Sequence, residues 1–264
     1  MTTPPNERRR RRGLPLLITG AVLAGAIAGG VVVSQLNNPD TPAEPTTTTT
    51  AEPTAATTAP ALGSGYTVEA GAGGTRMANA DGKTPMGYPS TCEAAIAAAT
   101  NYAAVLEATD MSSATPEGVA TYNALIDEIS PGAIPGAGMW QDLAKEERAQ
   151  YAELFADPPL LWTSLPEVGA FRVVSCTPER SAEIDVVMGG ELRTDASPEA
   201  DRWYIGQRVQ LTWLNDWSPR DISNLPGDEA IGLLVSPNEF TRSLRDSALT
   251  GDLAQWQEYS NVPF

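Results

Sequence analysis

The sequence predicts an α+β protein carried on one membrane-spanning helix, and three observations lead to this prediction. An uncharged stretch, 14–36, lies near the N-terminus. Amphipathic helical patterns occupy roughly residues 90–156, and segments rich in β-branched and aromatic residues follow from 171 onward. Helices first and strands afterwards predict helices packed on an antiparallel sheet, rather than alternating units with a parallel sheet.

The N-terminus is predicted to be a cytoplasmic tail, 1–13, followed by a transmembrane helix, 14–36. Five arginines, Arg8 to Arg12, precede the apolar run, and basic residues stay on the cytoplasmic side. A helix of this length spans about 34 Å, enough for a hydrocarbon core of about 30 Å. We therefore expect a single-pass protein of the cell membrane whose C-terminal domain is extracellular. The alternative is a cleaved signal peptide, with Ala26-Ile27-Ala28 as the cleavage site.

Small residues recur on one face of this predicted helix, at Ala21, Gly25 and Gly29. They would let two such helices approach closely enough for backbone packing. This pattern predicts helix packing in a homo-oligomer. The alternative is that small residues are simply common in a span of this composition.

Residues 37–87 are predicted to be an extracytoplasmic linker. Thr, Pro, Ala and Glu dominate to about residue 61, and the segment 63–87 is rich in glycine. Such a composition buries little apolar surface and favours an extended chain, and it is the kind that carries O-linked sugars in some exported proteins. Only one edge strand is expected here, near Tyr66–Val68.

The charge is unequal on the two sides of the predicted span. Of 17 Lys and Arg, five precede the span, and of 33 Asp and Glu, only Glu7 does. The outer part therefore carries a net charge of −20, from 12 basic and 32 acidic residues. Such a surface repels phosphate backbones and anionic lipid, so we expect no direct nucleic-acid binding by the outer domain.

Three helices open the outer domain, which is predicted to span 88–264. The first begins with the capping box Ser90-Thr91-Cys92-Glu93. The second begins at Thr115-Pro116, a capping residue followed by proline in the first turn. The third spans about 140–156. Its predicted apolar face holds Leu143, Tyr151, Leu154 and Phe155, and its charged face holds Lys145 to Arg148.

Strands follow the helices. In one of them Val209 and Leu211 share an apolar face, while Tyr204 and Arg208 lie on the other, the pattern of an antiparallel sheet with one wet side. A final helix is expected to begin at the cap Ser236-Pro237-Asn238-Glu239 and to run through Leu249. The predicted strands are Phe171–Cys176, Ser181–Met188, Trp203–Leu214 and Trp217–Ile222.

Three aromatic residues are candidates for contact with a partner or ligand. Trp217 follows the turn Asn215-Asp216, and Trp256 and Tyr259 lie in the tail after the final helix. Aromatic side chains with a polar end suit such contacts. The alternative is that they fill the core of the domain.

Cys92 and Cys176, the only cysteines, both fall in the exported part. An even pair in an oxidising compartment predicts a disulfide. Closing so long a loop would stabilise the domain by about 4 kcal/mol on the chain-entropy model. The alternatives are two buried free thiols or metal ligands, the latter poorly supported by two thiols without histidine.

The chain has no histidine, which excludes the Ser-His, Cys-His and HExxH hydrolases. A carboxylate pair among Glu183, Asp185 and Glu191 could still serve a glycosidase. Glu183 and Asp185 also fit the wet face of a strand. We therefore predict a protein that is not an enzyme and that holds no cofactor or metal ion.

Short segments in a fixed order carry a resemblance to a known family. Over 88–264 the chain resembles uncharacterised actinobacterial membrane proteins encoded on integrative and conjugative elements. That family is similar to the extracytoplasmic assembly factors of conjugation and type IV secretion systems, which have a nuclear-transport-factor-2-like fold. The segments are Gly87-Tyr88-Pro89, Glu93-Ala94-Ala95, Ala99–Tyr102, Phe171–Ser175, Pro178-Glu179-Arg180, Val209–Trp213, Asp216-Trp217 and Tyr259–Pro263.

The resemblance implies a curved antiparallel sheet wrapped on helices, and a non-catalytic scaffold that binds other membrane subunits of the apparatus. The cysteine pair and the third helix depart from the family's pattern. The alternative is a ligand-binding or cell-wall-associated ectodomain that uses the interior of the cone as a pocket. A deep polar cavity would favour that alternative, whereas a filled interior and an exposed apolar patch would favour the scaffold.

Overall fold

The computed structural model describes seven parts of the chain. The predicted cytoplasmic tail, the predicted transmembrane helix with Ala21, Gly25 and Gly29, and the linker up to 64 lie outside them. Within the parts that are described, no helix is long and apolar enough to cross a membrane. The described residues are 65–107, 115–132, 134, 136–154, 160–194, 197–225 and 239–264.

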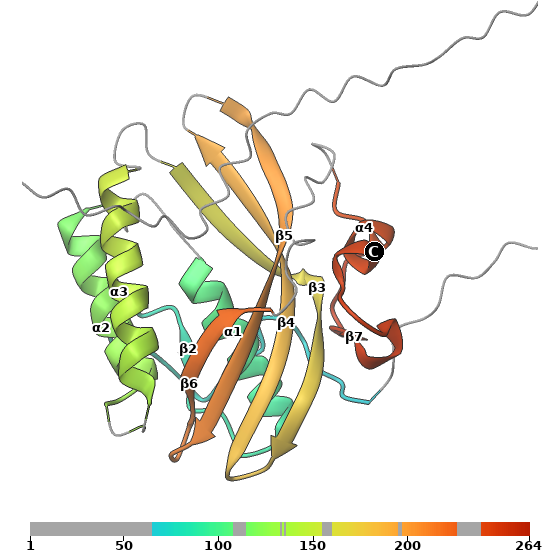
Figure 1. Ribbon diagram of the computed structural model, residues 1–264, viewed down its shortest axis with the longest axis horizontal. Coiled ribbons are helices and arrows are strands. Elements are labelled where there is room, and N and C mark those ends of the chain that lie inside the picture. Colours follow the sequence, from blue (N-terminus) through green and yellow to red (C-terminus); the bar gives the residue numbers. More distant parts are fainter. Residues whose placement is uncertain are drawn as a thin grey trace, which may run out of the picture. The chain divides into compact units, whose positions relative to one another are not determined.

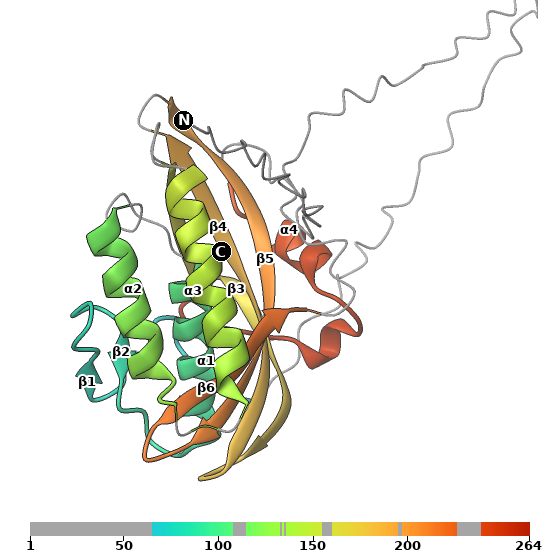
Figure 2. The same ribbon diagram turned by 60° about the vertical axis from the view of Figure 1, so that its left-hand side comes forward.

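The described domain is built on a five-stranded antiparallel sheet with the strand order β6-β5-β4-β3-β7. Helices cover one face, and the C-terminal segment lies against the other (Figure 1). The long strands curve around the helices (Figure 2). The α+β prediction, with helices on a curved antiparallel sheet, is confirmed. The strands are β3 (Leu160–Thr177), β4 (Ser181–Thr194), β5 (Ser197–Trp213), β6 (Trp217–Asn224) and β7 (Gln257–Glu258).

Helix α1 (Cys92–Glu107) lies directly on the sheet. Alanines such as Ala95 and Ala99 are fully buried, and their small side chains let the helix approach the strands closely. Its N-cap is Thr91, whose Oγ1 accepts the Ala94 N–H at 3.2 Å. The predicted cap at Ser90 was one residue too early, because the Ser90 hydroxyl instead contacts Glu179, at 3.5 Å.

Helices α2 (Pro116–Ile129) and α3 (Ala137–Leu154) pack against each other. The predicted cap of α2 is confirmed, since Thr115 Oγ1 accepts the Gly118 N–H at 3.0 Å. Ser130 ends the helix and donates its hydroxyl to the Pro219 carbonyl of β6 at 2.6 Å. This contact fixes the end of α2 to the edge of the sheet.

Helix α3 presents a different face to the core from the one predicted. Arg148 is buried, with its guanidinium 4.3 Å from the Tyr122 ring centroid, and it donates to the Leu106 carbonyl at 3.1 Å. Leu143 is exposed instead. An aromatic face and a carbonyl satisfy a buried guanidinium, and hydropathy patterning does not register such partners. Of the other predicted apolar residues, Tyr151 and Leu154 lie in α3 but their side chains are outside the described part, and Phe155 lies outside the described residues.

The segment 65–87, which was predicted to be linker, packs onto the domain. It contains the short strands β1 (Arg76–Met77) and β2 (Pro85–Met86), which lie beside α2 in Figure 2. The predicted strand at Tyr66–Val68 does not form, although the Val68 carbonyl accepts the Ser260 N–H at 2.8 Å. At Gly74 a Cβ would lie 1.9 Å from the Met86 carbonyl oxygen. Glycine is therefore required at position 74 by this close approach of two backbone segments. The packing of residues 65–87 also shows that the folded domain begins well before residue 88.

The outer face of the sheet, opposite the helices, is covered in its centre by α4 (Arg242–Ala248) and the 3₁₀ turn η3 (Leu253–Gln255). Tyr204, predicted on a wet face, is buried with its ring 5.3 Å from that of Phe240. Gly189 leaves room for this contact, because a Cβ there would lie 2.9 Å from the Phe240 ring.

The predicted final helix begins later than expected. The N-cap of α4 is Thr241, whose Oγ1 accepts the Leu244 N–H at 3.3 Å. Within the predicted cap, 236–238 lie outside the described residues. The helix ends at Ala248, one residue before the predicted end.

A disulfide joins Cys92, at the start of α1, to Cys176, near the end of β3. The predicted bond is confirmed, and neither cysteine is a free thiol or a metal ligand. A backbone hydrogen bond from Glu179 to the Ser90 carbonyl, 3.1 Å long, lies beside it. The first helix is thereby fastened to the end of the β3–β4 hairpin.

Candidate functional site

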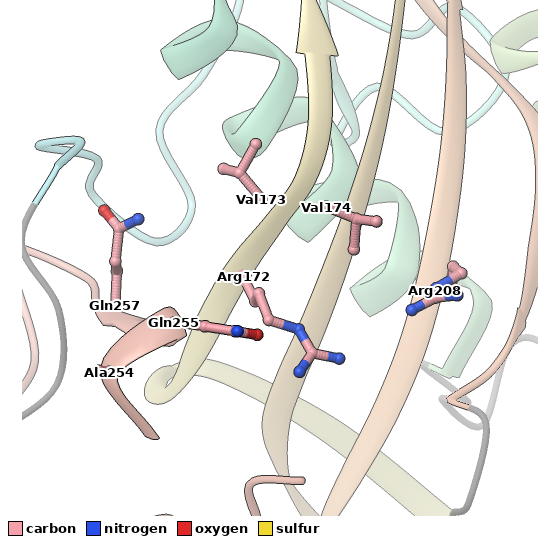
Figure 3. A pocket seen from close by; sticks show the side chains of 7 residues that line it. All are labelled: Arg172, Val173, Val174, Arg208, Ala254, Gln255 and Gln257. Carbon is pink, nitrogen blue, oxygen red and sulfur yellow. The ribbon is translucent and has the colours of Figure 1, made fainter. Parts of the chain in front are cut away.

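A pocket of about 600 Å³ opens where β7 leaves β3. Phe171 of β3 pairs with Gln257 of β7, and the 3₁₀ turn η3 lies just before Gln257 in the chain. Figure 3 shows Arg172 and Arg208 extending from the sheet toward the space beside Gln255. The pocket is lined by Arg172, Val173, Val174, Arg208, Ala254, Gln255 and Gln257.

The floor of this pocket is an ion-paired ladder across three strands. Arg172, Asp185 and Arg208 lie directly opposite one another on β3, β4 and β5. The Asp185 side chain is fully buried; its Oδ2 accepts Arg172 Nε at 3.0 Å and its Oδ1 accepts Arg208 Nε at 2.7 Å. Each arginine also makes a second hydrogen bond to Asp185 through Nη2. A buried carboxylate is thereby held by two guanidinium groups.

The arginines of this cluster are also engaged elsewhere. Arg172 Nη1 donates to the Thr250 carbonyl at 3.2 Å, and its guanidinium lies 4.8 Å from the Trp256 ring centroid. Arg208 Nη1 lies 3.3 Å from a Glu183 carboxylate oxygen. The hydrogen bonds from Arg208 to Asp185 raise the pKa of Arg208, so it stays cationic. The two arginines are thus balanced by the carboxylates of Asp185 and Glu183, and the cluster presents no free positive charge. Through its contacts with Thr250 and Trp256, Arg172 holds the C-terminal segment on the sheet.

Glu191, the third carboxylate singled out in the sequence, lies further along β4 with its own two arginines. Its oxygens accept Arg202 Nε and Arg193 Nη2, each at 2.6 Å. Burial opposes ionisation of Glu191, but these hydrogen bonds outweigh it and lower its pKa. A glycosidase acid needs the opposite shift, so Glu191 is poorly suited to that role.

Among the described residues, large side chains of the domain itself lie between the helices and the sheet. Tyr102, Phe171, Trp217 and Tyr259 are all essentially fully buried. The hydroxyl groups of Thr100 and Tyr259 lie 2.8 Å apart and share a hydrogen bond. Burial raises the pKa of both Tyr102 and Tyr259, so these phenols stay neutral. These described side chains are closely buried, and the Thr100–Tyr259 pair forms an internal hydrogen bond, whereas the buried Tyr102 hydroxyl has no hydrogen-bond partner among the described residues.

The three aromatic residues predicted to contact a partner or ligand all lie in the interior. Trp217 donates from Nε1 to the Pro89 carbonyl at 2.9 Å. Trp256 donates from Nε1 to the Thr250 carbonyl at 2.8 Å, beneath Arg172. Tyr259 contacts Phe171, with ring centroids 5.1 Å apart. All three are buried, as in the alternative of core packing. For Trp256 and Tyr259, a short tail without periodicity could not reveal this in advance.

The surface feature that sequence reasoning missed is the outward face of α3. Met139 and Leu143 are exposed there, one helical turn apart, with the exposed acids Asp142 and Glu146 beside them. Hydropathy patterning placed Leu143 inside. The orientation of the helix depends on the burial of Arg148 against Tyr122, which no local sequence pattern reveals.

No protein-family model, curated protein or solved structure matches this chain. The described residues contain no group of three or more Cys, Asp and Glu side chains placed to hold a metal ion. Function must therefore be inferred from the packing, the charges and the exposed surfaces of the domain itself.

Proposed function

We propose that this chain is a single-pass membrane scaffold, an assembly subunit of a conjugative DNA-transfer or secretion apparatus that acts through protein–protein contacts. The segment 14–36 anchors it, the arginine-rich tail stays in the cytoplasm, and the domain lies outside the cell. The fold we propose is a nuclear-transport-factor-2-like cone, supported by the helices packed on a curved antiparallel sheet. The proposed role requires neither catalysis nor a cofactor.

The burial of large side chains in the described part of the interior is the observation that carries this proposal. A cone that binds a small ligand needs a cavity between its helices and its sheet. Here Tyr102, Phe171 and Trp217 occupy that space with almost no exposed surface. Binding would therefore have to use the outside of the domain, as in a protein that holds other proteins.

The alternative, a ligand-binding or wall-associated ectodomain, would rely on the outer pocket. The contacts that the two pocket arginines already make weigh against it. The Nε and Nη groups of Arg172 and Arg208 already contact Asp185, Glu183 and the Thr250 carbonyl. A ligand would have to displace these bonds, and the separated charges would then lie partly buried, which is costly.

Chemical crosslinking of the full-length protein in its native membrane, followed by mass spectrometry, tests the proposal. We expect recovery of other membrane subunits and of an ATPase of a transfer or secretion machine. A bitopic protein with an unrelated acidic outer domain, expressed at the same level, controls for nonspecific capture. Recovery of the protein only with itself and wall material would contradict the proposal.

A further inference from the structure

The outward face of α3 exposes two large apolar side chains that the core does not use. Met139 is 74% exposed and Leu143 is 60% exposed. Single exposed apolar residues are common, but these two stand four residues apart and therefore share one face of the helix. They are also the most exposed large apolar residues in the described part of the chain.

The orientation of α3 is fixed by buried polar contacts on its other side. Gln141 donates from Nε2 to the Ser130 carbonyl, and Arg148 donates to the Leu106 carbonyl at 3.1 Å. Trp140 is buried on this side as well. Turning the helix to bury Leu143 would break these bonds and leave buried polar groups without partners, which is costly. The two apolar side chains therefore stay at the surface of the domain.

The charges around this apolar pair have one sign. Asp142 and Glu146 are exposed on the same side of the helix. Lys145 lies 2.5 Å from Asp127, which neutralises it, and Arg148 is buried. Among the described side chains of α3, no exposed base offsets the two acids. A second copy of the chain placed face to face would set acid against acid, whereas a basic surface would be complementary.

We propose that the face formed by Met139, Asp142, Leu143 and Glu146 is the docking surface for a basic amphipathic helix of a partner protein. An apolar residue of that helix packs between Met139 and Leu143, and its Lys or Arg residues pair with the acids. A helix is the fitting partner because α3 presents a ridge of side chains four residues apart rather than a free strand edge. The inference rests on the proposed scaffold function and names the surface that the scaffold uses.

Site-specific photocrosslinking tests this surface in the full-length protein in its native membrane. A photoreactive amino acid at position 143 is compared with one at Val174, an exposed apolar position on β3. We expect crosslinks from position 143, mapped by mass spectrometry to a segment with helical apolar periodicity and several Lys or Arg residues. Position 174 should capture that segment at least tenfold less.

Charge reversal gives the matched control. Asp142→Lys/Glu146→Lys should reduce the crosslink from position 143 at least tenfold. Glu69→Lys/Glu239→Lys changes the net charge equally at exposed acids outside α3 and should leave the yield within twofold. Thermal unfolding of the purified full-length variants checks that both pairs fold as the parent does.

The outcomes separate this inference from the scaffold proposal. Crosslinks from position 143 to a second copy or to an acidic segment would overturn the inference. Partners captured by whole-protein crosslinking but never from position 143 would also overturn it, and would leave the scaffold function standing. Capture of no partner by either method would remove both.

Discussion

The two faces of the sheet are covered by different kinds of interaction. On the helix side, Phe171 and Ile184 belong to the larger apolar cluster of the domain, which also contains residues of α1. On the outer side, Asp185 is clamped by two arginines, and Arg245 of α4 bridges to Glu258 of β7 at 2.8 Å. The comparison teaches that one face is stabilised mainly by burial of apolar surface, whereas the other combines a smaller apolar cluster with ion pairs that dock the C-terminal segment.

The largest effect is expected on the helix side. Phe171→Ala should lower the free energy of unfolding by about 3 to 5 kcal/mol, because it removes a buried ring and leaves a cavity. Urea denaturation monitored by circular dichroism measures this loss. Val174→Ala, an exposed position on the same strand, should stay within about 0.5 kcal/mol of the parent. Equal losses at the two positions would contradict the assignment of the core.

A somewhat smaller loss is expected on the outer side. Asp185→Asn should cost about 3 kcal/mol, the low end for breaking a buried ion pair, because Arg172 and Arg208 keep some exposure. The same denaturation measurement applies. Lys145→Ala breaks an ion pair whose acid, Asp127, is largely exposed, and should cost less than about 1 kcal/mol. If Asp185→Asn lowers the free energy of unfolding no more than Lys145→Ala does, the ion pairs of Asp185 with Arg172 and Arg208 do not stabilise this face.

The smallest effect is a pH dependence at Glu191, also on β4. Its pKa in the folded domain lies below the ordinary value of 4.5, so the ionised carboxylate stabilises the fold above pH 4.5. That contribution is lost as the pH falls through the lowered pKa. Unfolding free energies measured between pH 7 and pH 3 should therefore fall less steeply in Glu191→Gln than in the parent. The exposed Glu69→Gln serves as the control, and a Glu191→Gln slope equal to that of the parent would contradict the ion pairing.

Features set by local chemistry could be predicted from the sequence. The cap at Thr115 and the pairing of Cys92 with Cys176 depend on short patterns or on compartment chemistry, and both are confirmed. Helices α1 to α3 and strands β3 to β6 were predicted in the right order because their apolar periodicities differ, whereas β1 and β2 were not predicted. Strand ends were less accurate, since β3 and β4 extend well beyond the segments predicted for them.

Features set by tertiary partners could not be predicted in this way. Tyr204 appeared to face water because the segment that covers it, around Phe240, lies far along the chain. Gly74 and its neighbours resembled a linker because a glycine needed for close packing cannot be told from a flexible one by composition. Arg148 was placed outside because no local pattern reveals the Tyr122 ring that receives it.

The central claim is that the domain works through its outer surface rather than its interior. The most direct test compares the crosslinked partners of the full-length protein in its native membrane for the parent, Met139→Ser/Leu143→Ser and Tyr102→Phe. The claim predicts that other membrane subunits are recovered with the parent and with Tyr102→Phe. With the double variant, their recovery should be at least tenfold lower. Partners lost with Tyr102→Phe but retained with Met139→Ser/Leu143→Ser would contradict it.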